Sequence, residues 1–454
     1  MPMFSRPPLR ALLLAASCSA FASVPVAAQA AGNWELRIDG RSAWPVLVAF
    51  GGGAGNSMHA AALTGEGTVR IREATRAGDG LNATVALGRR EYRLRATVRG
   101  DSLTGMLTGA ADSMAVRGVR IPARALAPIR GAAVFDSVTR ALQNVFYDPG
   151  MNGANWPALV ARLRPRAAAA RSDAEAFTAI NELLDSLHSS HLAFSAQPAM
   201  GAAPSAPSAP ASPAVARPAA VSWRVLSPSL GYLRIQSFVP TGQAALPDFA
   251  RLDSAFREMG SLPGLIIDLR GNGGGSLDLA ARLGQHLIAR PTAAGYFVTR
   301  TGFTSRGMRA AGALDPATVR PLSTSTTGAT LRASVDAGGG AGMVYVGGGM
   351  GSPFAGRIAI LTDGRTGSAA EAFGAALREV RGAMVVGERS AGAMLSAEEM
   401  AIAPGWVLRY PAMDFRTPSG RRVEVVGVQV DVPSPAAGEA PIRAAAQALG
   451  HPLP

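Results

Sequence analysis

The sequence contains no lysine, so all 44 of its basic residues are arginine. The arginine side chain stays protonated at neutral pH and cannot accept a proton during catalysis. Any enzymatic mechanism that needs a lysine base is therefore excluded. The formal net charge is +13, but the arginines are scattered, and the chain has no basic run of the kind found in nucleic-acid-binding arms. We therefore expect no nucleic-acid partner.

Cysteine is almost absent as well. The single cysteine, Cys18, lies in the apolar run "ALLLAASCSAFASV", which follows two arginines and precedes small residues at Ala28 and Ala30. This order is typical of a secretory signal peptide, which we predict over residues 1–30. The mature chain would then contain no disulfide and no cysteine metal site. Lipid attachment at Cys18 is the less favoured alternative.

Long apolar runs are also missing after residue 30. None approaches the ~18 residues that a membrane-spanning helix needs, so we expect no integral membrane span. Together with the signal peptide, this predicts an exported protein, periplasmic or secreted.

What is present suggests a multidomain α/β protein. Residues 31–125 hold short alternating segments such as "TVRIRE" and "EYRLRATV", separated by Gly, Asp and Asn turns. That pattern favours a small antiparallel β barrel or sandwich, and "GNWELRI" resembles the first strand of lipocalin-like barrels. This region contains no candidate acid, base or nucleophile.

The rest of the chain divides by composition and periodicity. Apolar residues recur at three and four positions over residues 131–195, which predicts a helical subdomain. Residues 196–222 are rich in Pro, Ala and Ser and indicate an extended linker. Residues 223–440 alternate buried-strand runs with amphipathic helices and predict an α/β core. Within it, residues 297–355 are rich in Gly and Thr and are expected to form a loop or hairpin over the core.

A glycine-rich loop follows one of the predicted core strands, in "IIDLRGNGGGSLDLAARL". Its backbone N–H groups could hold an anion near a helix start. A phosphate is one candidate, although no Gly-Lys-Ser/Thr is present, and a transient oxyanion is another. A tight turn without any ligand is the third interpretation.

Ser368 lies where a second predicted strand turns into a helix, in "LTDGRTGSAAEAFGAALREV". Serine is a preferred helix N-cap, so capping alone would explain it. Helix-start N–H groups would also stabilise negative charge on or beside a nucleophilic serine. The surrounding residues differ from the Gly-x-Ser-x-Gly elbow of hydrolases.

Histidine is the residue most able to accept a serine proton, and the chain has five. His188 and His191 occur together in "LLDSLHSSHLAF", where a predicted helix ends. Their spacing of three could place both on one helix face for a metal, but no third ligand is evident. A structural histidine and a general base are the other interpretations.

Four stretches together resemble the C-terminal-processing (tail-specific) serine peptidases, in their tricorn-like and interphotoreceptor-retinoid-binding-protein-like branch. They are "LLDSLHSSHLAF", "GLIIDLRGNGGGS", "TGSAAEAFGAAL" with "AMVVGERSAG", and "GRRVEVVGVQVDVP". The resemblance covers residues from about 131 to 435 and implies a ClpP/crotonase-like catalytic core. It also implies a serine endopeptidase that acts on unfolded or C-terminal peptide segments, with no metal and no cofactor. The implied roles are nucleophile for Ser368, general base for His191, support for Ser190 and Glu424, and oxyanion donors for the N–H groups of Gly274 and Ala369.

The sequence departs from the family pattern at several positions. Ala393 occupies the place of the lysine base used by processing peptidases, which leaves the Ser-His arrangement. Val425 replaces the glycine after the glutamate, and Val430 replaces the proline before Asp431. The alternative function is a non-catalytic relative that holds a peptide or an apolar ligand. Oligomeric state and cleavage preference do not follow from the sequence.

Overall fold

The protein is described by a computed structural model. The described residues are 30–39, 46–63, 69–87, 90–110, 112–122, 125–197, 219–239, 245–305, 314–322, 328–349 and 352–453. The predicted signal peptide, apart from Ala30, and most of the predicted linker lie outside these residues. None of the described helices is long and apolar enough to cross a membrane.

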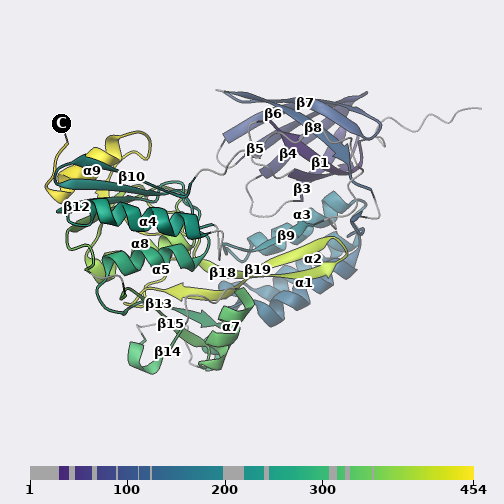
Figure 1. Cartoon of the computed structure of the whole chain (residues 1–454). Helices are drawn as coiled ribbons and strands as arrows, with labels where there is room; N and C mark the ends of the chain where they lie inside the picture. The colour runs from purple at the N-terminus through teal and green to yellow at the C-terminus, as the bar shows by residue number, and fades with distance from the viewer. Residues whose placement is uncertain are drawn as a thin grey trace, which may run out of the picture.

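The N-terminal region is a closed antiparallel barrel of eight strands (Figure 1). Each strand pairs with the next, and the first pairs with the last, so the barrel alternative is confirmed over the sandwich. Every second side chain faces inward, where Trp34, Phe50 and Leu81 are buried among other apolar residues. The strands are β1 (Gly32–Ile38), β2 (Val46–Gly52), β3 (Ser57–Ala62), β4 (Val69–Ala77), β5 (Gly80–Leu87), β6 (Arg90–Arg99), β7 (Ser102–Thr108) and β8 (Ser113–Arg120).

A helical region follows the barrel. It contains α1 (Ala132–Val145), the short 3-10 helix η3 (Met151–Gly153), α2 (Trp156–Ala168), α3 (Asp173–Asp185) and the strand β9 (Ala193–Ala196). Ser172 caps α3, since its hydroxyl accepts the Glu175 N–H at 3.3 Å. The chain leaves α3 directly into the segment that carries His191.

One wall of the barrel packs on the helical region. Leu47, Ala49, Ala61 and Leu63 face out of the barrel, and they are buried in the same apolar cluster as the helices. The Ala196 N–H also donates to the Leu63 carbonyl at 2.7 Å. The barrel is thus joined to the remainder of the protein by a shared core.

The first sheet of the α/β region has the strand order β10-β11-β12-β16-β17-β20. Its neighbours are parallel except for the β10–β11 pair. Helices α4, α5 and α8 share an apolar cluster with one face, and α9 covers the other. The elements are β10 (Val221–Ser227), β11 (Leu230–Ile235), α4 (Leu246–Met259), β12 (Gly264–Asp268), α5 (Leu277–Leu287), β16 (Arg357–Thr362), α8 (Ala369–Arg381), β17 (Met384–Gly387), β20 (Val432–Pro433) and α9 (Ala440–Leu449).

The second sheet has the order β14-β15-β13-β19-β18. Two of its strands and two helices fall within residues 297–355, so this segment is more ordered than the loop or hairpin expected there. Its strands are short and rich in Gly and Ala, which hides the usual alternation of apolar and polar residues. The elements are β13 (Thr292–Thr299), α6 (Arg300–Ser305), the 3-10 helix η6 (Pro316–Thr318), β14 (Arg320–Pro321), α7 (Gly328–Ala337), β15 (Ala341–Val346), β18 (Leu395–Ala403) and β19 (Trp406–Arg416).

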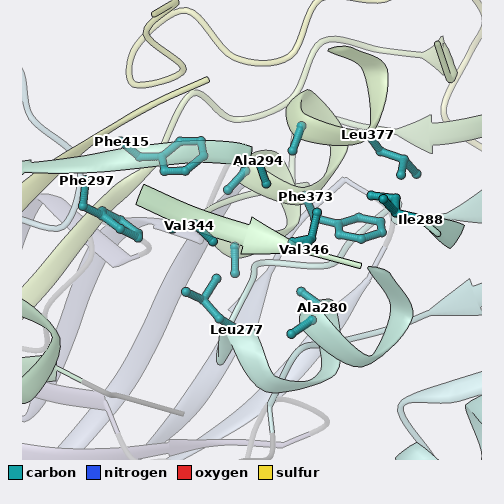
Figure 2. Close-up of a pocket in the computed structure, with 14 residues that line it drawn as sticks. Leu277, Ala280, Ile288, Ala294, Phe297, Val344, Val346, Phe373, Leu377 and Phe415 are labelled. Atoms are coloured by element: carbon teal, nitrogen blue, oxygen red, sulfur yellow. The ribbon is translucent and has the colours of Figure 1, made fainter. Parts of the chain in front are cut away.

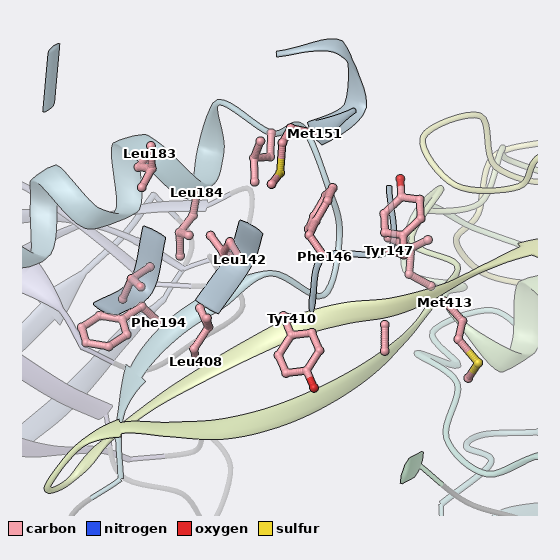
Figure 3. Close-up of a cluster of buried hydrophobic side chains, with 14 of the residues drawn as sticks. Leu142, Phe146, Tyr147, Met151, Leu183, Leu184, Phe194, Leu408, Tyr410 and Met413 are labelled. Atoms are coloured by element: carbon pink, nitrogen blue, oxygen red, sulfur yellow. The ribbon is translucent and has the colours of Figure 1, made fainter. Parts of the chain in front are cut away.

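The long strand β19 connects the helical region to this second sheet (Figure 1). Its first residues pair with β9, between Trp406↔Ala196 and Arg409↔Ala193. Its last residues pair with β13. Along the same strand, Leu408, Tyr410 and Met413 belong to one apolar cluster with Leu142, Phe146 and Leu183 of the helical region and other residues (Figure 3). This packing fixes the position of the segment before β9, which includes His191.

Candidate active site

Two loops meet at the carboxyl ends of the neighbouring parallel strands β12 and β16. The Gly271 N–H donates to Asp363 Oδ1 at 2.9 Å, and the Gly367 N–H donates to the Asn272 carbonyl at 2.9 Å. The glycine-rich loop after β12 and the serine turn after β16 are therefore held together. Such loop pairs at one sheet edge are where α/β proteins usually place their ligands.

Ser368 is the N-cap residue of α8, and its backbone has φ 54° and ψ −126°. A serine that only caps a helix normally has an extended backbone with negative φ. A non-glycine residue in a sparsely populated conformation costs on the order of 1–3 kcal/mol, and such residues cluster at functional sites. The strained turn supports the nucleophile interpretation over simple capping.

Gly274 approaches this turn closely. It has φ 96°, and a Cβ added to it would lie 2.6 Å from Ser368 Cβ and 2.8 Å from Ala369 N. Both the backbone conformation and the contact require glycine at this position. The loop therefore places its backbone beside the candidate nucleophile.

The candidate base lies in a second group of residues. Ser190 and His191 fall between α3 and β9, and Glu424 lies after β19. Ser190 Oγ is 2.8 Å from His191 Nδ1 and donates to Glu424 Oε2 at 2.8 Å, while the Ser190 N–H donates to Glu424 Oε1 at 2.7 Å. A hydroxyl has one hydrogen, so with Glu424 ionised the Nδ1–H of His191 donates to Ser190 Oγ. The Nε2 atom then carries the lone pair needed to accept a proton.

A short backbone segment links the two groups. The Ser368 N–H donates to the Ala393 carbonyl at 3.0 Å, and the next residue, Met394, donates its N–H to Glu424 Oε2 at 2.8 Å. Ser368 and His191 both belong to the described part of the chain, and no hydrogen bond joins them directly. Such contacts are often long in ligand-free sites and shorten when substrate binds.

Glu371 is a member of the site that the sequence did not reveal. It is fully buried, and its Oε1 accepts from Ser390 Oγ at 2.5 Å and from the Gly392 N–H at 2.6 Å. Its Oε2 accepts from the Ala393 N–H at 2.8 Å and from the Ser368 N–H at 3.0 Å. The spacing Ser-x-x-Glu from Ser368 is a capping-box signal, which could have drawn attention to it.

The two expected oxyanion donors, the N–H groups of Gly274 and Ala369, differ in whether they already make a hydrogen bond. The Gly274 N–H donates to Asn272 Oδ1 at 2.9 Å. The Ala369 N–H begins α8 and makes no hydrogen bond within the described part of the chain. Ala369 is therefore available to an oxyanion as the site stands, whereas Gly274 would have to share its hydrogen with Asn272.

Burial shifts the pKa values of three titratable groups in the site, His191, Glu424 and Glu371. It lowers the pKa of His191, because desolvation disfavours the imidazolium. It raises the pKa of Glu424, against the opposing effect of hydrogen bonds from Ser190 and Met394. It also raises the pKa of Glu371, again against its hydrogen bonds. A histidine that stays neutral at pH 7 suits the role of a base.

The other histidine of the pair does not join the site. His188 is exposed and contributes to a surface hollow between α2 and α3, with Arg162 and Asp185 among its neighbours. No group of three or more His, Cys, Asp or Glu side chains that could hold a metal occurs among the described residues.

Two arginines near the loops could in principle bind a peptide carboxylate. Arg270 is paired with Asp268 and also donates to the Ala436 and Gly438 carbonyls, which makes it a structural residue. Arg365 is paired with Asp363 at 3.2 Å, but its side chain is 80% exposed. Of the two, only Arg365 could turn toward a ligand.

An apolar pocket opens between α5, α8, β13 and β15 (Figure 2). Ala369 and Ala372 line it, so it begins at the residue after Ser368. Its volume is about 40 Å³, and all of its lining residues are apolar. The remaining lining residues are Leu277, Ala280, Ala281, Ile288, Ala294, Phe297, Val344, Val346, Phe373, Ala376, Leu377 and Phe415.

A strained serine at a helix start, a hydrogen-bonded Ser-His-Glu group and an apolar pocket are features that serine hydrolases combine in their active sites. Family comparison agrees with this class. Residues 229–434 match the family model "Peptidase family S41", and residues 132–185 match "Tricorn protease C1 domain". The resemblance noted from the sequence is confirmed, and the chain is a peptidase in the serine protease class of hydrolases.

One solved structure shares this fold at low sequence identity, and two others are more distantly similar. A candidate peptidase from Parabacteroides merdae ATCC 43184 is 17% identical, with a TM-score of 0.50 over 70% of this chain and 96% of its own. The photosystem II D1 C-terminal processing protease is also 17% identical, with a TM-score of 0.41 over 70% of this chain and 97% of its own. The tricorn protease is 12% identical, with a TM-score of 0.39 over 84% and 45%. No curated protein matches this chain.

Proposed function

We propose that the protein is an exported serine endopeptidase that cleaves unfolded or C-terminal peptide segments through Ser368 and His191. The observation that carries the proposal is the position of Ser190 Oγ, between His191 Nδ1 and Glu424 Oε2 at 2.8 Å from each. This arrangement orients the imidazole and leaves Nε2 free to act as a base. The predicted signal peptide supports the exported location.

In the proposed mechanism, Ser368 Oγ attacks the carbonyl carbon of the scissile peptide bond while His191 Nε2 takes its proton. The negative oxygen that forms is stabilised by the Ala369 N–H, with the Gly274 N–H as second donor; each such donor contributes about 3 kcal/mol in related sites. The C–N bond then breaks, and His191 returns the proton to the leaving amine. Water, activated by the same imidazole, releases the acyl group and restores Ser368.

The apolar pocket supports a preference for the residue before the scissile bond. It starts at Ala369, directly after the nucleophile, and has no polar lining group. A cavity of about 40 Å³ accepts a small aliphatic side chain, such as that of Ala or Val, more readily than an aromatic or charged one. We therefore propose substrates with small apolar residues at this position.

Labelling with a fluorophosphonate probe tests the proposal. The wild-type protein is expected to acquire the label, and Ser368→Ala is expected to lose it. Ser276→Ala is a suitable control, because Ser276 caps the nearby helix α5 through the Asp278 N–H and has no catalytic role here. If the folded wild-type protein takes up no label, the alternative of a non-catalytic peptide- or ligand-binding protein is favoured.

A further inference from the structure

A buried arginine in the N-terminal barrel lacks partners for most of its charge. Arg76, at the end of β4, is only 5% exposed. Its Nε donates to the Gly78 carbonyl at 2.7 Å, but its Nη1 and Nη2 atoms are buried and have no hydrogen-bond partner. It is also the only buried charged or polar residue among the described residues of the barrel.

A β-bulge turns this side chain toward the barrel interior. The β4–β5 register shifts between Arg72 and Thr75, where Glu73 has φ 52°. Before the bulge, Ile71 packs against the interior cluster and Arg72 is exposed. After the bulge, Ala74 and Arg76 are buried. Without the extra residue, Arg76 would face solvent with Arg72, so the bulge re-aims it.

The surroundings of Arg76 are apolar. Its cross-strand partner is Leu81, which is fully buried, and Leu81 in turn pairs with Ala96. The interior cluster otherwise consists of hydrophobic side chains, Trp34 and Phe50 included. No ion pair to Arg76 is found among the described residues, whereas Arg120 at the same end of the barrel binds Asp101 at 2.8 Å.

An unpaired buried charge is strongly unfavourable, because desolvation is not compensated by an opposite charge. Two parallel N–H groups of a guanidinium match the two oxygens of a carboxylate. The interior of an eight-stranded barrel is either filled by its own side chains or holds one small ligand. We propose that the barrel binds a monocarboxylate with an apolar body, its carboxylate on Nη1 and Nη2 of Arg76 and its hydrocarbon part among the interior side chains.

This site is separate from the peptidase site. The interior cluster of the barrel shares no member with the apolar cluster around α8. The proposal therefore does not depend on the proposed function, and a change at Arg76 should leave the hydrolysis of short peptides unchanged.

Calorimetric titration of the full chain, stripped of lipid, with decanoate, decanol and acetate tests the proposal. Decanoate is expected to bind about tenfold or more tightly than either decanol, which lacks the charge, or acetate, which lacks the apolar body. Arg76→Met should reduce decanoate binding to the level of decanol, and Arg76→Lys should give an intermediate affinity. Arg72→Met is the matched control, because Arg72 lies on the same strand but is 60% exposed, and it should bind like wild type.

Three binding results would overturn the proposal. They are equal binding of decanoate and decanol by the wild-type protein, equal binding of decanoate and acetate, and unchanged decanoate binding by Arg76→Met. Thermal melting provides a further check. Without ligand, Arg76→Met should melt at or above the wild-type Tm, since methionine suits apolar neighbours, and decanoate should raise the Tm of the wild type only. A lower Tm for the ligand-free variant would show that the protein itself already satisfies the guanidinium, and would also overturn the proposal.

Discussion

At the scale of single residues, the two neighbouring histidines should behave very differently. His191 contacts Ser190 and is partly buried, whereas His188 is exposed. Because burial lowers the pKa of His191, its basic form persists below the ordinary value of 6.5. We expect kcat/KM to rise with pH through a midpoint below 6.5 and then to level off. A midpoint clearly above 6.5, measured on a short peptide, would contradict this assignment.

Replacement of each histidine should confirm the difference. His191→Ala should lose activity on the order of 10⁴-fold while the fold persists, as for other members of catalytic triads. His188→Ala should stay within about twofold of wild type, the usual range for an exposed residue. Equally large losses of activity in His191→Ala and His188→Ala would instead indicate that both histidines take part in catalysis.

Glu371 gives a second prediction at this scale. Both of its oxygens face N–H or O–H donors, so an amide group in Glu371→Gln would place its NH₂ against donors in either orientation. We expect kcat to fall about 10- to 100-fold, comparable to the loss of a supporting hydrogen-bond partner, with KM nearly unchanged. Glu399→Gln, at an exposed glutamate, is the control. An unchanged kcat in Glu371→Gln would show that Glu371 does not position Ser368.

The sequence allowed prediction of those site residues for which the chain offers few alternatives. Ser368 and His191 stood out because no lysine could serve as the base and few histidines exist. Glu371 did not, because a glutamate in the first turn of a helix is normally exposed and favoured by the helix dipole. Val425 was noted as a departure, and it has φ 68°, a conformation that normally selects glycine. Such strain cannot be read from a single sequence.

At the scale of elements, the inner face of α8 should set substrate preference. Ala372 lies one turn after Ser368 and lines the apolar pocket. Ala372→Val narrows the pocket, so we expect a lower kcat/KM for peptides with Val before the scissile bond and a smaller change for peptides with Ala. Competition between paired peptides, followed by mass spectrometry, would measure this ratio.

Gly374 offers a control on the same helix. A Cβ at Gly374 would meet nothing within 4 Å, so Gly374→Ala should raise helix stability by up to about 1 kcal/mol. It should leave the Val/Ala preference unchanged. If Ala372→Val and Gly374→Ala shift the Val/Ala preference equally, the pocket does not receive the substrate side chain that precedes the scissile bond.

The barrel, the helical segments and the parallel strands of the core were predictable because each has a regular period in its apolar residues. The second sheet was not. β13 and β15 are buried strands of mixed Gly, Ala and aromatic residues. They pair with each other, and β13 also pairs with β19, more than 110 residues further along the chain. Pairing over such separation depends on tertiary packing, which overrides local propensity.

At the scale of the whole molecule, the barrel should stabilise the helical region without taking part in catalysis. Leu63 is fully buried in the shared core, and its replacement by Ala should cost about 2–5 kcal/mol. We expect Leu63→Ala to lower both the Tm of the barrel and the temperature at which peptidase activity is lost. The kcat at 25 °C should stay unchanged. Differential scanning calorimetry and residual activity after heating would measure both.

Leu103→Ala is the matched control, because Leu103 is buried inside the barrel and away from the shared wall. It should destabilise the barrel while heat inactivation of the peptidase is less affected. If both variants inactivate alike, the barrel unfolds as one unit with the rest of the chain. If Leu63→Ala lowers kcat without lowering stability, the barrel wall contributes to the active site.

The contact between Ser190 and Glu424 joins residues 234 positions apart. Contacts of such high sequence separation form late in folding, because the intervening chain must first become ordered. The imidazole is therefore oriented only after nearly all of the catalytic region has been synthesised and packed. A nascent or partly unfolded chain is therefore expected to lack the oriented imidazole, and with it the proposed peptidase activity.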